Sequence, residues 1–171
     1  MSEPSNLAAL IQLIRSAFPH RIANPLPLIS PETHRDEEVI ETERTFAGVT
    51  DWTNLSAHAL DSGWASGLAF LSDEAVCFFI PAYLVADVGG KLARADPVSA
   101  LINGLDGRHG STHATEGMTA EQRAQERWRR LTRAQCEVVA GYLRHKHFKE
   151  PHLQDAIAPA LNRYWLPRAA T

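Results

Sequence analysis

The chain has 171 residues, of which 44% are hydrophobic and 22% charged, with a formal net charge of −3. This length and composition are typical of one globular domain, residues 1–171. No run approaches the ~18 to 20 apolar residues of a transmembrane helix, and the first residues lack the basic and apolar regions of a signal peptide. We therefore expect a cytoplasmic protein without a membrane segment.

The first third of the chain predicts two helices joined by a proline-rich connection. Apolar residues recur at helical spacing over residues 5–18. Four prolines in residues 19–31 favour an extended surface connection. Ser30 followed by Pro31 is typical of a helix start, so the next helix is expected at about 31–46. This second helix is rich in acids and has few apolar anchors.

The middle of the chain predicts a short helix at about 51–60 and then a buried central helix. Ser72 is a good N-cap, and the residues from 75 to 88 are almost wholly apolar, which is typical of a helix enclosed on every side. Pro81 supplies no N–H, so this helix must kink there or stop and restart. Four of its side chains are expected to be largely buried: Phe78, Phe79, Tyr83 and Leu84.

The last third predicts further helices and one loop. Residues 106–117 have no large apolar anchor and are expected to form a mobile loop. Two capping boxes then start two helices: Thr119 with Gln122, and Thr132 with Gln135. A final helix at about 153–165 needs a break or bend at Pro159. No strand pattern competes, so the sequence predicts an all-α, mainly helical single domain around the Pro-containing central helix.

Several motifs follow one another in order between about residues 35 and 145. They are Trp52-x-x-Leu55, Phe70-Leu71-Ser72-x-Glu74-Ala75, Phe79-Ile80-Pro81-Ala82-Tyr83-Leu84 and Leu131-Thr132-x-x-Gln135. This order resembles a family of small bacterial proteins catalogued only as a domain of unknown function. The resemblance implies a bacterial, soluble and mostly helical protein, and it supplies no catalytic residue, cofactor or activity.

The charge distribution is the best functional clue in the sequence. Residues 1–90 carry a net charge of −8, and residues 91–171 carry +5. Within the expected acidic helix, Glu37 and Glu41 are i, i+4 neighbours that repel each other. Three explanations stay open: a face that is solvated or paired with arginines, a docking face for a basic protein, and a carboxylate metal site that lacks a placed histidine. The candidate partner-binding residues are Asp36, Glu37, Glu38 and Glu41.

Other patterns argue against nucleic acid, metal and cofactor chemistry. A cluster of arginines surrounds Trp128, but acids and a pI of about 6.2 disfavour nucleic-acid binding. His109 and His113 have i, i+4 spacing, yet the glycines around them argue against a helix there. Cys77 and Cys136 lie in apolar helical patterns, which is typical of core thiols. No catalytic residue, metal ligand or cofactor is predicted.

Two function classes remain. The first is a non-catalytic protein-binding module, of the immunity or inhibitor type, that docks a basic partner through the acidic helix. The second is a small enzyme whose Asp, Glu and His residues are brought together only in space. A deep polar pocket lined by these residues would favour the enzyme, and a flat or convex acidic face would favour the binding module.

Overall fold

The computed structural model describes residues 3–30, 33–62, 67–107 and 117–171. The chain forms two compact units, unit 1 (residues 1–97) and unit 2 (residues 98–171), and each is described by itself. The described residues form helices and no β-strand, which confirms the prediction of a mainly α-helical fold. The prediction of a single domain stays a prediction.

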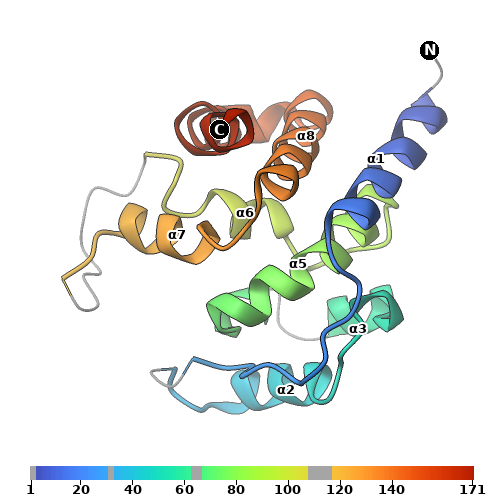
Figure 1. Ribbon diagram of the computed structural model, residues 1–171, viewed down its shortest axis with the longest axis vertical. Coiled ribbons are helices and arrows are strands. Elements are labelled where there is room, and N and C mark those ends of the chain that lie inside the picture. Colours follow the sequence, from blue (N-terminus) through green and yellow to red (C-terminus); the bar gives the residue numbers. More distant parts are fainter. Residues whose placement is uncertain (1–2, 31–32, 63–66, 108–116) are drawn as a thin grey trace. The chain divides into compact units, whose positions relative to one another are not determined.

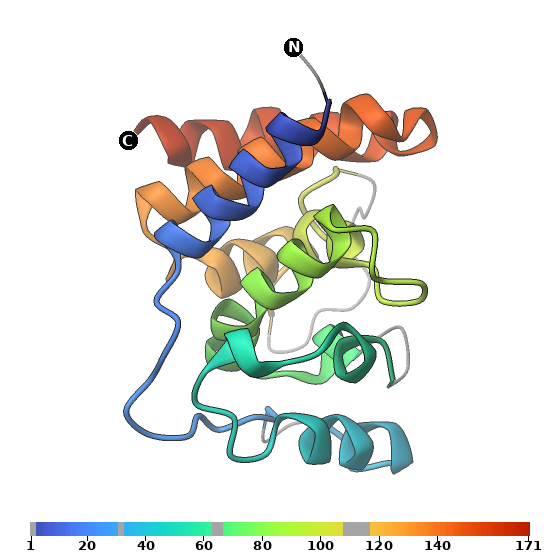
Figure 2. The same cartoon turned by 90° about the vertical axis from the view of Figure 1, so that its right-hand side faces the viewer.

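Unit 1 is built around the predicted central helix, α5. Figures 1 and 2 show α5 between α1 and α2, and α1, α3 and the short helix η1 all contact it. The helices of unit 1 are α1 (Glu3–Ala17), α2 (Glu37–Phe46), η1 (Trp52–Asn54), α3 (Ala57–Ser62), α4 (Gly67–Phe70) and α5 (Asp73–Val88). The helix predicted at about 51–60 is thus two short pieces, η1 and α3.

Helix α5 is the core of unit 1, as the apolar run predicts. The Ser72 hydroxyl accepts a hydrogen bond from the N–H of Ala75 (3.1 Å) and caps its start. The helix continues through Pro81 as one element, so it does not stop and restart there. All four side chains expected to be buried are at most 8% exposed, and the Phe79 ring lies 4.6 Å from the ring of Phe46 in α2.

The proline-rich connection is extended, as predicted, and both of its ends are fixed to unit 1. Near its start, the Trp52 indole N–H donates to the Pro19 carbonyl (2.9 Å), and the Arg21 guanidinium donates to the Asp51 carboxylate (2.7 Å). Near its end, the N–H of Ser72 donates to the Leu28 carbonyl (2.7 Å). The connection is therefore held by hydrogen bonds at both ends: its start contacts residues 51 and 52, and its end contacts the start of α5.

The predicted start of the acidic helix is wrong. Helix α2 begins at Glu37, six residues later than the Ser30–Pro31 pattern indicates. The Asp36 side chain accepts a hydrogen bond from the N–H of Val39 (3.0 Å), and this cap sets the start of the helix. Ser30 lies instead in the extended connection, whose path is set by the contacts of Leu28 and Ile29 with Ser72 and Leu71.

Unit 2 begins with α6 and ends with a long helical run. Both predicted capping boxes are present, at Thr119 and at Thr132. Figure 1 shows the C-terminal helix beside α8, and these two helices are in contact. The elements of unit 2 are α6 (Pro97–Ile102, whose first residue closes unit 1), α7 (Ala120–Trp128), α8 (Arg133–Lys149), η2 (Pro151–Leu153), α9 (Gln154–Ala160), η3 (Leu161–Trp165) and α10 (Leu166–Ala170). Of the predicted loop at 106–117, residues 108–116 lie outside the described residues.

Of the break or bend that the sequence predicts at Pro159, the break does not occur. Pro159 lies within α9, and the chain then passes through the π-helical segment η3 into α10. A proline removes one N–H from the helical ladder, and a wider π turn lets the helix absorb that interruption without ending. Trp165 of η3 is fully buried, and its indole N–H donates to the Leu101 carbonyl (3.1 Å).

The first prediction concerns the core of unit 1. Phe79→Ala should lower the free energy of unfolding by about 3 to 5 kcal/mol, because the ring is fully enclosed. The same substitution at Phe148, which is 80% exposed, is the matched control and should change stability by less than about 0.5 kcal/mol. Chemical denaturation of both variants measures the difference, and equal effects would refute the enclosed position of Phe79.

The second prediction concerns pH. Hydrogen bonds from the Thr53 hydroxyl and the Arg21 guanidinium lower the pKa of Asp51 to about 2, although burial opposes them. A carboxylate with a lowered pKa stabilises the fold above its unfolded value of 3.8, and this contribution is lost as the pH falls toward 2.

Asp51→Asn should therefore lower the melting temperature at neutral pH, and its deficit should shrink below pH 3.8. Melting curves of the two proteins over this pH range provide the measurement. A deficit that stays constant down to the lowest pH would show that the ionised carboxylate is not the stabilising group.

Candidate functional site

Helix α2 presents Glu37 and Glu41 on the face opposite its buried anchors, with Glu38 at the edge of that face. Its buried side chains are Val39, Thr42 and Phe46. Glu37 and Glu41 are exposed, and Glu38 is half-buried. The packing of α2 therefore uses one face, and the acidic residues lie along the outer one. We call Glu37, Glu38 and Glu41 the acidic face.

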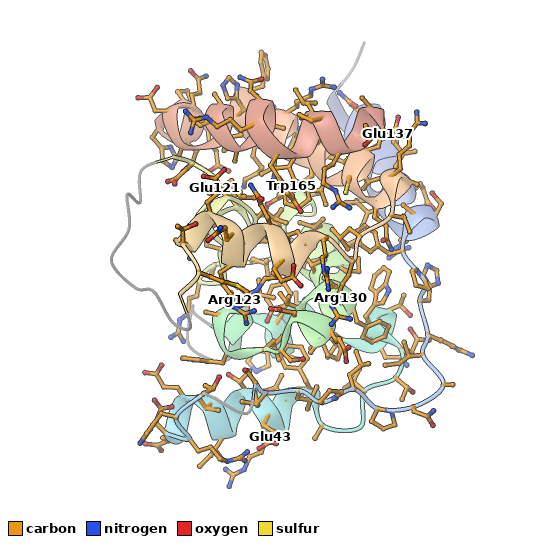
Figure 3. All side chains as sticks on the ribbon, turned by 60° about the vertical axis from the view of Figure 1, so that its left-hand side comes forward. Glu43, Glu121, Arg123, Arg130, Glu137 and Trp165 are labelled. Carbon is orange, nitrogen blue, oxygen red and sulfur yellow. The ribbon has the colours of Figure 1, made fainter. Side chains whose placement is uncertain are left out.

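The acids of α2 differ in what they contact. Asp36 caps the helix, so its carboxylate has a structural role. Glu43, labelled in Figure 3, pairs with Arg35 in the segment before the helix. Within the part of the chain that the structure describes, none of the three residues of the acidic face forms an ion pair. Their mutual repulsion is therefore not offset by a close ion pair within those segments.

Four arginines of the cluster around Trp128 lie in α7 and the turn after it: Arg123, Arg127, Arg129 and Arg130. Figure 3 shows Arg123 and Arg130 on the side of this element away from Trp165. Trp128, the aromatic residue among these arginines, is fully buried and lies 5.7 Å from the Trp165 ring. It is a core residue, so it offers no exposed ring on which a nucleic-acid base could stack.

Unit 2 also holds an open pocket of about 420 Å³ that sequence reasoning missed. One wall comes from α7 and its flanks: Met118, Gln122, Gln125, Glu126 and Arg129. The other wall comes from the C-terminal run: Tyr164 of η3 and Arg168 of α10. The Tyr164 hydroxyl donates to the Gln125 carbonyl (3.2 Å), which joins the two walls.

Arg168 fixes the geometry of this pocket. Its guanidinium donates to the carbonyls of Leu131 (2.7 Å) and Arg129 (3.2 Å), and it lies 5.7 Å from the centre of the Tyr164 ring. These contacts tie α10 to the turn between α7 and α8. By contrast, Arg129 is 65% exposed and pairs with Glu126 at 2.9 Å, three residues earlier on the same helix.

Within the described segments, the cysteines and histidines form no group that could hold a metal ion. Neither cysteine is in a disulfide; burial raises the pKa of the Cys136 thiol, an effect that nearby Arg168 partly opposes. Among the described residues, no group of three or more His, Cys, Asp and Glu side chains could hold a metal ion. His109 and His113 lie outside the described residues.

Comparisons with known proteins identify a family and nothing closer. A family model described as a family of unknown function (DUF6714) matches residues 6–169. No curated protein and no solved structure matches the chain. In the segments that the structure describes, no helix is both long enough and apolar enough to cross a membrane.

The third prediction concerns Arg168. Arg168→Met keeps most of the apolar stem but leaves the buried Leu131 carbonyl without this donor, which should cost about 1 to 3 kcal/mol of stability. Arg144→Met, at an exposed position of α8, is the matched control and should have little effect. Denaturant titrations compare the two, and equal stability of both variants would contradict the role given to Arg168.

Proposed function

Since the chain belongs to the DUF6714 family, whose function is unknown, we propose a role from its own residues: it is a non-catalytic protein-binding module that docks a basic protein partner. The docking surface is the acidic face of α2. The observation that carries the proposal is that Glu37 and Glu41 are exposed opposite the buried anchors of α2, with half-buried Glu38 beside them, and that none of the three forms an ion pair with the described residues.

The physical argument concerns what the acidic face costs. Glu37 and Glu41 are at i, i+4, and Glu38 and Glu41 are at i, i+3, where like charges destabilise a helix by about 0.2 to 0.5 kcal/mol per pair. Glu37 and Glu38 lie in the first turn, where the helix dipole offsets part of this cost. Glu41 lies beyond that turn, and its cationic helix neighbour Arg44, at i+3, forms no close ion pair with it, so this compensation is incomplete. A cationic partner surface would complete it.

The charge of unit 1 supports a basic partner. Residues 1–97 contain 6 Lys and Arg residues against 13 Asp and Glu residues. A surface of one sign speeds the encounter with a partner of the opposite sign and disfavours partners of the same sign. Small size, an exposed acidic helix and a basic partner together fit an immunity or inhibitor type of protein. The two cysteines, neither of which is in a disulfide, fit a reducing cytoplasm.

The fourth prediction tests this docking surface. Purified parent protein and a Glu37→Lys/Glu41→Lys variant are used to capture partners from lysate of the native cell. The matched control is Glu121→Lys/Glu137→Lys, which makes the same charge change at exposed positions of unit 2 labelled in Figure 3. The α2 variant should lose a basic partner that both other proteins retain, and added salt should release that partner from them.

Melting temperatures of the three proteins distinguish lost binding from lost structure. Asp36 still caps α2 in the variant, so its melting temperature should remain close to that of the parent. Identical sets of captured proteins from all three would refute the docking face. A large drop in melting temperature would instead show that the acidic face stabilises the fold.

A further inference from the structure

We propose that the pocket between α7 and the C-terminal run of unit 2 binds a small organic anion, a carboxylate or phosphate carried on an apolar body. The site is separate from the acidic face and does not depend on the proposed docking function. Its volume of about 420 Å³ falls in the range of small-molecule pockets. Its residues divide into cationic groups and an apolar surface, which together define the ligand.

The cationic part of the pocket is Arg129 and Arg168. A guanidinium matches the geometry of a carboxylate or phosphate, with which it can form two parallel hydrogen bonds. Arg168 is held by two main-chain carbonyls and by the Tyr164 ring, so little side-chain freedom is left to lose on binding. It presents a fixed positive charge at one wall.

Arg129 is the group that can exchange partners. It is held by an ion pair with Glu126, a neighbour at i, i+3, and both side chains are partly solvated, with exposures of 65% for Arg129 and 39% for Glu126. Pairs of this kind contribute only about 0 to 1 kcal/mol. A ligand anion that also contacts Arg168 can therefore displace the Glu126 carboxylate from Arg129. Glu126 acts as a weak internal competitor for the site.

The apolar part of the pocket comes from Met118 and the Tyr164 ring. Met118 is 40% exposed, so part of its side chain is accessible to a ligand, and its thioether is flexible and adapts to varied surfaces. Tyr164 belongs to the π-helical segment η3. Such segments are rare and frequently occur at functional sites. The Gln122 and Gln125 side chains add polar groups to the wall formed by α7.

Met118 also gives a site-specific measurement. The chain has two methionines, Met1 and Met118, so the methyl signal of Met118 in an NMR spectrum reports on this pocket and is assigned by its loss in Met118→Leu. The probes are phenyl phosphate and benzoate, with benzyl alcohol as the neutral analogue. Both anions should shift the Met118 signal to saturation at millimolar concentrations, and benzyl alcohol should bind at least about tenfold more weakly.

Three variants test the roles of the charged groups. Arg129→Gln should weaken binding of both anions by about tenfold or more, because it removes a charge-assisted hydrogen bond. Glu126→Gln should tighten binding, because it removes the internal competitor. Arg144→Gln, at an exposed position outside the pocket, should leave affinity unchanged. The opposite signs at two neighbouring positions would not arise from general loss of structure.

The contrary results are equally clear. Absence of a saturable shift with either anion would overturn the proposal. Equal binding of benzyl alcohol would show that the site recognises only the apolar body of the ligand. An unchanged affinity in Arg129→Gln would show that Arg129 does not bind the anionic group. If one anion alone binds, the site keeps its anionic class and the ligand head group is identified.

Discussion

A helix that is apolar on every side must be covered on every side, and in unit 1 that constraint falls on α5. Eleven of its sixteen residues are buried, Pro81 among them. Burial of this kind is the main favourable term in folding, at about 25 cal/mol for each Å² of apolar surface removed from water. Helices α1 and α3, the short helix η1 and the Phe46 ring of α2 all pack on it. The elements that cover α5 turn their apolar side chains toward it, so their polar side chains are left on the outside.

This division explains how a helix as acidic as α2 can be part of a stable unit. Its anchors Val39, Thr42 and Phe46 carry the packing, while Asp36 fixes its start through a hydrogen bond. The remaining carboxylates are not required by either of these interactions. A surface that the fold does not need is open to selection for binding, and this is the physical basis of the proposed docking face. The pocket of unit 2 differs from the acidic face, because two of its lining residues, Arg168 and Tyr164, also stabilise the fold.

The features that the sequence predicts well are those decided by neighbouring residues. The caps at Ser72, Thr119 and Thr132 need only residues up to three positions away, and all three are present. The burial of Phe79 follows from an uninterrupted apolar run in the same way. The start of α2 was mistaken because Ser30 and Asp36 are both good caps, and contacts of the connection with residues 71 and 72 select between them.

The pocket has no signal in the sequence, because its two walls are separated by about forty positions along the chain. Tyr164 reaches the Gln125 carbonyl across 39 residues, and Arg168 reaches the Leu131 carbonyl across 37. Gln122 could be recognised only as part of a capping box, its local role. The π-helical segment after Pro159 has no signal in the sequence either, since a π turn depends on how Trp165 and Tyr164 pack.

The central functional claim, that the acidic face is not needed by the fold, is tested most directly by the salt dependence of stability in Glu41→Gln, a substitution that keeps shape and helix propensity. At low salt the variant should unfold at a temperature equal to or above that of the parent, and the difference should vanish as salt screens the repulsion. A variant that is clearly less stable than the parent at low salt would show that Glu41 is held by a favourable contact within the chain, and would contradict the account.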